Sequence, residues 1–199
     1  CHIRLNFLVV GGRAHIYVHR DCVVHVAAKA GVPPRGANPS YTETDDYNDA
    51  AVHLTNHVAK KGLPSGNSGT SAHHHTTSKM ITLLDLEKDR NIPNLANYLF
   101  EDMCNVIKQV FTILNGRGDL FLPVENTFEM FGADFLVQAN ESNDTGNSMG
   151  NYKCILLEIN SGPGLEGRVN PELCTSIMDD TLKIVFDPWY RNLCNTIGL

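Results

Sequence analysis

Apolar and polar residues alternate over the first part of the chain. The alternating apolar residues are Ile3, Leu5 and Phe7, and they lead into a continuous apolar run. A period of two is typical of a β-strand with one buried face. Gly11 and Gly12 then predict a turn, residues 15–19 a second alternating strand, and the valines at 23–26 a third. We therefore expect the first 28 residues to form neighbouring strands.

Two later segments repeat their apolar residues at the helical period. The first helix is predicted over 94–115, where the stripe consists of Leu95, Leu99, Met103, Val106, Val110 and Leu114. This stripe is interpreted as core, without a catalytic role. The second helix is expected to begin with Asn170 as its N-cap and Pro171 in its first turn, and to end before Pro188.

Two further strands are predicted at 128–137 and 152–159, and the polar segment 140–151 between them is predicted to be a flexible hairpin loop. The segment 61–78 is rich in Gly, Ser, Thr and His and is predicted to be a second flexible loop. It contains three consecutive histidines at 73–75, which could bind a metal ion, although a solvated polar tract is the favoured interpretation. Together the elements predict an α+β fold with a mainly antiparallel sheet flanked by helices.

Composition narrows the range of partners. The 199 residues are 42% hydrophobic and 19% charged, as in an ordinary globular protein. The net charge of −6 argues against a nucleic-acid partner, which would require a basic face, but it is compatible with a nucleotide. We expect no membrane segment, because no apolar run approaches the roughly 18 residues needed to span a bilayer. Six scattered cysteines without a CxxC pair indicate a reduced, cytoplasmic protein.

Glu158 and Asn160 are the first candidates for chemistry. Residues two apart on a strand share a face, so these two are predicted to point to one side while Leu157 and Ile159 point to the other. If the two flanking strands pair as a hairpin, Asp134 lies beside Glu158. Three hard oxygen ligands then converge, which suits Mg²⁺, and a cation would offset the cost of burying carboxylates. An ordinary sheet whose polar residues face water explains the spacing at least as well, so spacing alone leaves both interpretations open.

A set of short segments is distributed over nearly the whole chain. They are Ile3-Arg4, 16–21, His53-Leu54-Thr55-Asn56, 128–136, 156–164 and a closing helix at 172–186. In the same order, these segments resemble the ligase domain of the tubulin tyrosine ligase family, and in particular its divergent, fungal-type members, with residues 53–56 similar to the family's HLTN motif. The resemblance implies that residues 1–199 are the C-terminal part of an ATP-grasp domain, in which ATP and Mg²⁺ bind between two α+β lobes. The start at Cys1, inside a strand-like pattern, also leads us to expect a fragment of a longer chain.

The resemblance also implies roles for individual residues. It assigns metal binding to Asp134, Glu158 and Asn160. It assigns nucleotide binding to Thr55, Asn56 and His2. Catalysis is assigned to Arg4 and Glu158. Arg4 matches an arginine that contacts the acyl phosphate or the substrate, where a bidentate guanidinium would stabilise developing charge. His53 could be catalytic, but a core or capping histidine is the favoured interpretation.

The implied activity is that of an ATP- and Mg²⁺-dependent carboxylate–amine ligase. A substrate carboxylate attacks the γ-phosphate of ATP and forms an acyl phosphate with release of ADP. An amino-acid amine then displaces phosphate to form an amide, while the metal neutralises charge on the phosphates. The implied partners are ATP, an amino acid and the carboxylate of a protein acceptor, for which the tail of tubulin is one candidate.

Three departures from the family pattern leave alternatives open. His2 stands where family members usually carry an aspartate, which alters the nucleotide side of the site. His25 stands where the tyrosine ligase has an arginine that holds the acceptor tail, and a protonated histidine could partly replace that cation. The family's phosphate-binding lysines and adenine hinge are expected upstream of Cys1. A non-catalytic binding or scaffold module of the same fold, and a ligase with an acceptor other than tubulin, are the alternatives.

Overall fold

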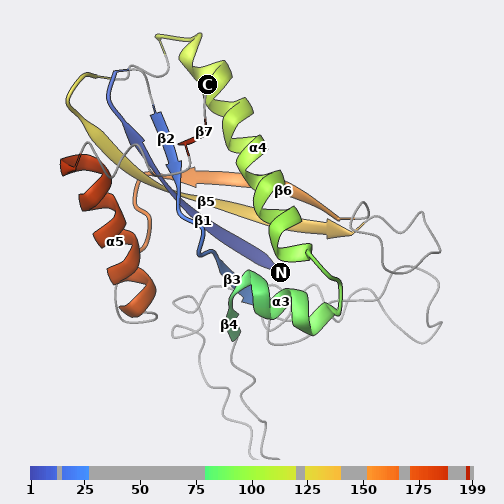
Figure 1. Cartoon of the computed structure of the whole chain (residues 1–199). Coiled ribbons are helices and arrows are strands. Elements are labelled where there is room, and N and C mark those ends of the chain that lie inside the picture. Colours follow the sequence, from blue (N-terminus) through green and yellow to red (C-terminus); the bar gives the residue numbers. More distant parts are fainter. Residues whose placement is uncertain are drawn as a thin grey trace, which may run out of the picture.

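The computed structural model (Figure 1) describes several separate parts of the chain. They are residues 1–12, 15–26, 79–119, 124–139, 152–165, 171–187 and 196–197. A number of the sequence predictions fall outside these residues. They are the loops at 61–78 and 140–151, the three histidines at 73–75, His53, Thr55 and Asn56, and the N-cap Asn170.

The described strands form one antiparallel sheet with helices beside it. The elements are β1 (His2–Val10), β2 (His15–Val18), β3 (Val23–Val26), β4 (Lys79–Ile81), α3 (Leu83–Arg90), α4 (Leu95–Asn115), β5 (Phe128–Ala139), β6 (Tyr152–Asn160), α5 (Pro171–Phe186) and β7 (Thr196–Ile197). The central strand β1 pairs with β5 along its whole length on one side, and with β2 and β3 on the other. β6 pairs with β5, β4 with β3 and β7 with β2. This arrangement confirms the predicted α+β fold with an antiparallel sheet flanked by helices.

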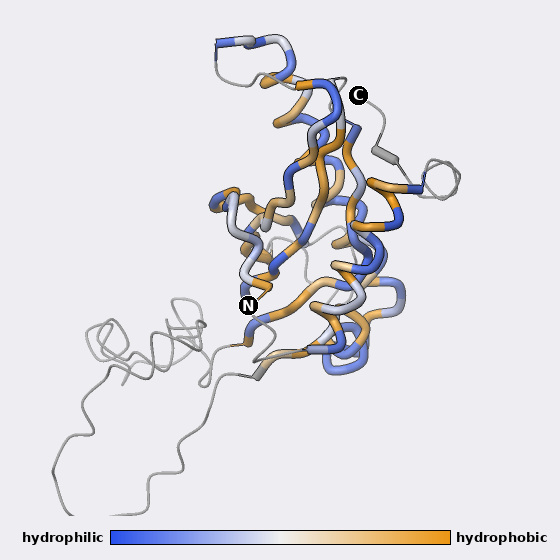
Figure 2. The backbone as a smooth tube through the Cα atoms, turned by 90° about the vertical axis from the view of Figure 1, so that its left-hand side faces the viewer, coloured by the Kyte–Doolittle hydropathy of each residue, from blue (hydrophilic) through white to orange (hydrophobic). Residues whose placement is uncertain are grey.

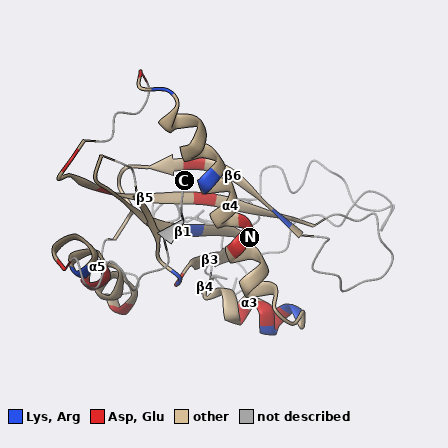
Figure 3. Ribbon diagram, turned by 45° about the horizontal axis from the view of Figure 1, so that its top comes forward, with Lys and Arg blue, Asp and Glu red and all other residues tan. Residues whose placement is uncertain are grey.

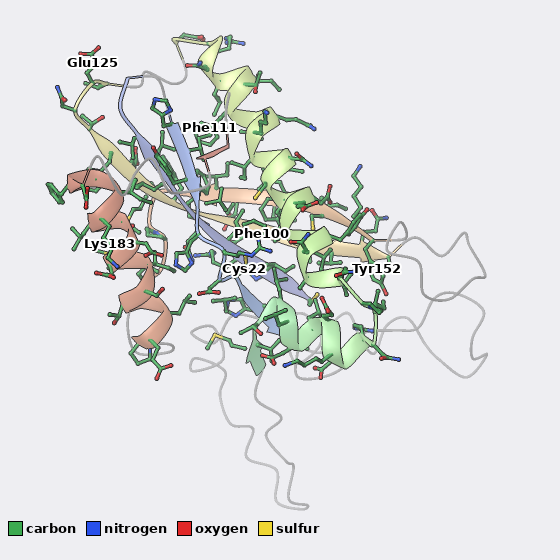
Figure 4. The ribbon with its side chains drawn as sticks, in the orientation of Figure 1. Cys22, Phe100, Phe111, Glu125, Tyr152 and Lys183 are labelled. Carbon is green, nitrogen blue, oxygen red and sulfur yellow. The ribbon has the colours of Figure 1, made fainter. Side chains whose placement is uncertain are left out.

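One face of the sheet is covered by α4, with α3 beside it (Figure 1). The odd-numbered residues of β1 from Ile3 to Val9 are buried in this core, and Figure 2 shows apolar residues recurring along the strands and along α4. Phe111 of α4, labelled in Figure 4, contacts the rings of Phe7 and Phe131 at centroid distances of 5.6 and 6.3 Å. The helix at 94–115 and its role as core are therefore confirmed. No helix in the described part of the chain is long and apolar enough to cross a membrane.

The short helix α3 was not predicted, because five of its eight residues are charged and only two are buried. Its start is fixed by a capping box, in which Thr82 Oγ1 accepts the N–H of Asp85 at 3.1 Å and the Asp85 carboxylate accepts the N–H of Thr82 at 3.1 Å. α3 also caps α4, because the Glu87 carboxylate accepts the N–H of Ala96 at 3.0 Å. Local hydrogen bonds therefore hold a helix that its weak apolar pattern does not reveal.

Among the described residues, α5 covers part of the opposite face of the sheet (Figure 1). The apolar cluster beneath α5 consists of Leu8, Val10, Tyr17 and Ile184. A polar contact adds to this packing, since His19 Nε2 lies 3.2 Å from Asp180 Oδ2. The helix begins at Pro171 and ends at Phe186, in agreement with the predicted boundaries. The half of the face that α5 leaves uncovered carries polar residues of β1, β5 and β6.

Polar contacts from α4 fix the start of β6. The Asp102 carboxylate accepts the backbone N–H of Cys154 at 2.7 Å, and the Tyr98 hydroxyl donates to the carbonyl of Tyr152 at 3.1 Å (Tyr152 is labelled in Figure 4). Cys154 is buried, so its N–H depends on Asp102 for a partner. These two contacts hold the strand that carries two of the predicted metal residues.

Replacing Asp102 with alanine should lower the free energy of unfolding by about 1–3 kcal/mol, because the buried N–H of Cys154 loses its acceptor. Asp102→Asn is the matched control, since its amide oxygen can still accept that N–H, and its loss should be smaller. Urea unfolding followed by circular dichroism measures both variants. Equal stability of the alanine variant and the unchanged protein would contradict the role given to Asp102.

Candidate functional site

The uncovered half of the sheet face holds three charged residues in one row. Arg4 of β1 pairs in register with Asp134 of β5, which in turn pairs with Glu158 of β6. Directly opposed residues of antiparallel strands project from the same face, so the three side chains are neighbours. Figure 3 shows the basic position on β1 and the acidic positions on β5 and β6. The next row of the same face consists of Asn6, Gly132 and Asn160.

Asp134 lies at the centre of the site. Its side chain is buried, and described residues supply donors to both of its oxygens. Arg4 donates through Nε to Oδ1 and through Nη2 to Oδ2 at 2.7 Å. His2 Nε2 lies 2.9 Å from Oδ1, and Asn160 Nδ2 donates to Oδ2 at 3.2 Å. Burial acts to raise the pKa of Asp134, but the hydrogen bonds from His2 and Arg4 outweigh it and hold the pKa at about 2.

Asn160 links the two carboxylates that were predicted to bind a metal. Its amide nitrogen donates to Asp134 Oδ2 at 3.2 Å and to Glu158 Oε1 at 3.0 Å. The structure therefore brings the three predicted residues together around one point. Two carboxylates and an amide oxygen are hard donors, so the residues present fit Mg²⁺. No three His, Cys, Asp or Glu side chains of the described residues form a group that could hold a metal, so Asn160 would have to supply the third ligand.

The pairing of β6 with β5 shifts by one residue at Leu157, just before the candidate ligands. Leu157 was predicted to share a face with Ile159, and this prediction is wrong. The extra residue forms a β-bulge and leaves Leu157 53% exposed, while Leu156 and Ile159 pack against the core. The two polar residues that follow the bulge still share one face, as predicted.

Exposed apolar side chains lie beside the charged row. Leu136, Ile155 and Leu157 are 42%, 40% and 53% exposed, and we call them the apolar border. Leu136 pairs with Ile155 on one side and with His2 on the other, and it lies two residues from Asp134 on the same face. The site therefore combines a charged row with an apolar surface at its edge.

His2 and His25 stack on neighbouring strands next to Asp134. Their ring centroids are 5.3 Å apart, and the two residues are directly opposed in the pairing of β1 with β3. Burial, together with the nearby His2 and Arg4, lowers the pKa of His25 to about 4. His25 is therefore neutral at neutral pH, and the idea that a protonated His25 replaces a permanent cation is not supported.

Two contributors to the site were not predicted. Asn6 is only 2% exposed on the face that carries Arg4, and its Oδ1 has no hydrogen-bond partner among the described residues. A polar residue in an otherwise apolar strand segment could have indicated it. The carbonyl of Pro163 accepts from Arg4 Nη1 at 3.3 Å, and the two residues lie 159 positions apart, so no local pattern reveals this contact.

The model of the Tubulin-tyrosine ligase family matches residues 1–193 of the chain. The probable tubulin–tyrosine ligase PBY1 of Saccharomyces cerevisiae is 28% identical over 203 residues, which cover 96% of this chain and 22% of that protein. The human protein monoglycylase TTLL8 is 25% identical over 146 residues, which cover 71% of this chain and 16% of that protein. The tubulin glycylase 3B of Tetrahymena thermophila is 25% identical over 146 residues, with coverages of 72% and 11%. The chain thus spans less than a quarter of the length of these relatives.

Replacing Arg4 with glutamine should destabilise the fold at neutral pH by about 2–3 kcal/mol, because the buried Asp134 carboxylate loses its cation. A carboxylate whose pKa is lowered in the folded state stabilises the fold fully at neutral pH. That contribution disappears as the pH falls from about 4, the ordinary value, through the folded-state pKa of about 2. Without Arg4 the pKa of Asp134 should rise toward its ordinary value, so the loss of stability between about pH 4 and pH 2 should become smaller. Urea unfolding across the acid range measures it.

Arg117→Gln is the matched control for this prediction. Arg117 also pairs with an aspartate, Asp119, at 2.8 Å, but the two side chains are 55% and 62% exposed. Removing this surface pair should leave the free energy of unfolding unchanged within error. If Arg4→Gln proves as harmless as Arg117→Gln at every pH, the pair between Arg4 and Asp134 does not stabilise the fold.

Proposed function

Because the chain belongs to the tubulin-tyrosine ligase family, we propose that it provides part of the active site of an ATP- and Mg²⁺-dependent carboxylate–amine ligase. This ligase adds an amino acid to the carboxylate of a protein. The observation that carries the proposal is the convergence of Arg4, Asp134, Glu158 and Asn160 on the uncovered half of the sheet face. The ATP-grasp-like fold of the family supports ATP as the source of energy.

In this proposal Asp134, Glu158 and Asn160 hold the metal ion. The amide of Asn160 donates to both carboxylates, so it has to turn over to present its oxygen to a cation. Rotation about this terminal bond is soft, and the contacts of the two carboxylates and the amide oxygen with the cation would replace the two hydrogen bonds that the turn breaks. The low pKa of Asp134 favours the same use, since it keeps the carboxylate ionised at neutral pH. A Mg²⁺ ion held by these residues would neutralise part of the charge on the phosphates.

Arg4 is proposed to contact the phosphoryl group that is transferred. The substrate carboxylate attacks the γ-phosphate and forms an acyl phosphate, and an amine then displaces phosphate and forms the amide. In the transition state the charge is spread over the three oxygens of the transferred group, and a planar guanidinium can bind two such oxygens. The hydrogen bonds of Arg4 to Asp134 fix its position before a substrate binds, which reduces the entropy lost on the way to the transition state.

The apolar border is proposed to receive the base of the nucleotide. Its three side chains expose apolar surface beside the candidate metal ligands, and a flat base can bury that surface. His2 borders the same edge through its pairing with Leu136. Thr55 and Asn56, which are proposed to contact the nucleotide as well, lie outside the described residues.

The proposal does not specify which amino acid is transferred or which protein accepts it. The relatives include a probable tubulin–tyrosine ligase, a protein monoglycylase and a tubulin glycylase, so family membership does not fix the amino acid. Tubulin is the first acceptor to test. A neutral His25 would hold an acidic tail less strongly than a permanent cation, so other acceptors belong in the same experiment. The free cysteines, including the buried Cys22 and Cys154, fit a reducing compartment, and the cytoplasm is the proposed location.

A second candidate function, a non-catalytic binding module, is favoured by one observation. Both oxygens of Asp134 already accept hydrogen bonds from Arg4, His2 or Asn160, so the carboxylate is satisfied without a cation. A module of this kind would keep the network as a structural element and bind a partner without turnover. The ligase requires Glu158 as a metal ligand, whereas the binding module does not. Glu158 is exposed and contributes little to the fold, so it can be replaced to distinguish the two functions.

Glu158→Gln should lower ligation by roughly 100-fold or more, because the site loses a charged metal ligand. The melting temperature without nucleotide should not change, since Glu158 is exposed and glutamine still accepts from Asn160. The full-length protein is incubated with ATP, Mg²⁺ and labelled amino acids, with tubulin or a cell extract as acceptor. Incorporation of label and the rise in melting temperature caused by Mg-ATP are both measured.

Glu129→Gln serves as the matched control, because Glu129 is an exposed glutamate of β5 that lies outside the site. It should retain ligation within experimental error. Ligation that survives Glu158→Gln would contradict the role of Glu158 as a metal ligand. If no acceptor takes up any amino acid and Mg-ATP does not raise the melting temperature, the ligase proposal is wrong and the binding module is favoured.

A further inference from the structure

The side chain of Arg4 passes between two glycines from different parts of the chain. Gly132 belongs to β5, and Gly164 follows β6. A Cβ atom added to Gly132 would lie 3.0 Å from Cδ and 3.1 Å from Nη1 of Arg4. A Cβ added to Gly164 would lie 3.2 Å from the same Nη1. All three distances are shorter than ordinary van der Waals contact, so with any other residue at these positions the side chain of Arg4 would have to shift by a few tenths of an ångström.

Nothing in the backbone explains a glycine at position 132. It lies inside a regular strand and does not adopt a positive φ angle, and glycine in a strand interior weakens the strand. The close approach of Arg4 does explain it, because only a residue without a Cβ leaves room for the guanidinium. Pro163 closes the same space, since its Cα would lie 3.3 Å from the added Cβ.

Gly164 has two separate reasons to be glycine. Its φ of +69° lies in the left-handed region, which other residues rarely adopt, and its missing side chain makes room for Arg4 Nη1. Two residues earlier, Gly162 has no atom within 4 Å of an added Cβ, so its position makes no such demand. The space requirement is therefore specific to the glycine that touches Arg4.

The two glycines surround a guanidinium that is also held by its hydrogen bonds. Nε and Nη2 donate to Asp134, and Nη1 donates to the carbonyl of Pro163 at 3.3 Å. Three of the five N–H groups of Arg4 thus have a partner among the described residues. The side chain is only partly buried, with 23% of its surface exposed. A ligand oxygen can therefore reach the remaining donors without breaking the contacts that fix the side chain.

We propose that Gly132 and Gly164 are positioning residues of the active site. They hold the guanidinium of Arg4 in the one orientation that binds Asp134 and Pro163 at the same time and leaves two N–H groups for a phosphoryl oxygen. The proposal rests on the proposed function, in that the ligand of these groups is the phosphate transferred from ATP. Neither glycine contacts the ligand, and each acts through Arg4.

Replacing either glycine with alanine in the full-length protein tests the proposal. The added methyl group should push the guanidinium aside, because the far end of a flexible side chain gives way more easily than the backbone of a sheet. We expect Gly132→Ala and Gly164→Ala to lower kcat by roughly 10- to 100-fold, as a displaced catalytic group does, with the KM for ATP changed by less than about twofold.

Two other glycines provide matched controls. Gly162→Ala places a methyl group in the same segment as Gly164 but in open space. Gly11→Ala reproduces the left-handed backbone, with a φ of +73°, and also meets no atom within 4 Å. Both should keep kcat within about twofold of the unchanged protein, since neither touches Arg4. A loss of kcat in Gly162→Ala equal to that in Gly164→Ala would overturn the proposal, because space for Arg4 would then not be the cause.

Combination with Arg4→Lys shows whether the glycines act through the arginine. Lysine lacks the Nη1 atom that a Cβ added at Gly164 would meet, so adding Gly164→Ala to Arg4→Lys should change kcat by less than about twofold. The same loss of kcat in both backgrounds would overturn the proposal. If the unchanged protein shows no ATP-dependent activity, the proposed function is wrong. The contact between Gly164 and Arg4 is then tested by the melting temperatures of the single and double variants. Non-additive shifts for Arg4→Lys and Gly164→Ala would support the contact of Gly164 with Arg4, and additive shifts would overturn it.

Discussion

The buried carboxylate of Asp134 is the constraint on which the rest of the site depends. A charge that is removed from water destabilises a fold unless an opposite charge and hydrogen bonds compensate it. Asp134 finds both in Arg4, the residue directly opposite on β1, and in His2 and Asn160 beside it. These contacts of Asp134 require one register of β1 against β5, because a shift of one residue would turn Arg4 toward the apolar core. The nine opposed residue pairs of β1 and β5 secure that register.

The residues of β1 make one half of the second sheet face apolar and the other half polar. The even-numbered residues of β1 are apolar where α5 covers them, at Leu8 and Val10, and polar where it does not, at His2, Arg4 and Asn6. Apolar burial beneath α5 therefore anchors the strand, while the other half of the face is available for chemistry. The core beneath α4 stabilises both halves through the other face of the sheet. The residues of the site therefore need to contribute little to the stability of the fold. A rigid support of this kind is what an active site requires to hold charged groups in place.

Much of the fold could be predicted from the sequence, because its main elements carry a clear period. The strands β1, β5 and β6 and the helices α4 and α5 agree with the alternating and helical patterns. The helix α3 was not predicted, because most of its residues are charged and its two buried leucines form no clear apolar stripe. The strands β4 and β7 are too short to show a period. Within the site, the convergence of Asp134, Glu158 and Asn160 was predictable once a hairpin was assumed. The roles of Asn6, Pro163 and Gly132 were not, because they depend on contacts between residues that are far apart in the sequence. Thr55 and Asn56 stay predictions.

The extra residue at Leu157 also bears on how this strand can change in evolution. In a regular strand, inserting one residue reverses the side on which every following residue lies. A bulge absorbs the insertion at one point, so the residues on either side keep their orientation. Glu158 and Asn160 therefore keep their face whether or not residue 157 is present. A lineage can gain or lose an apolar side chain next to its acidic residues in a single mutational step, and the ligand preference of the site can diverge while its charged residues stay in place.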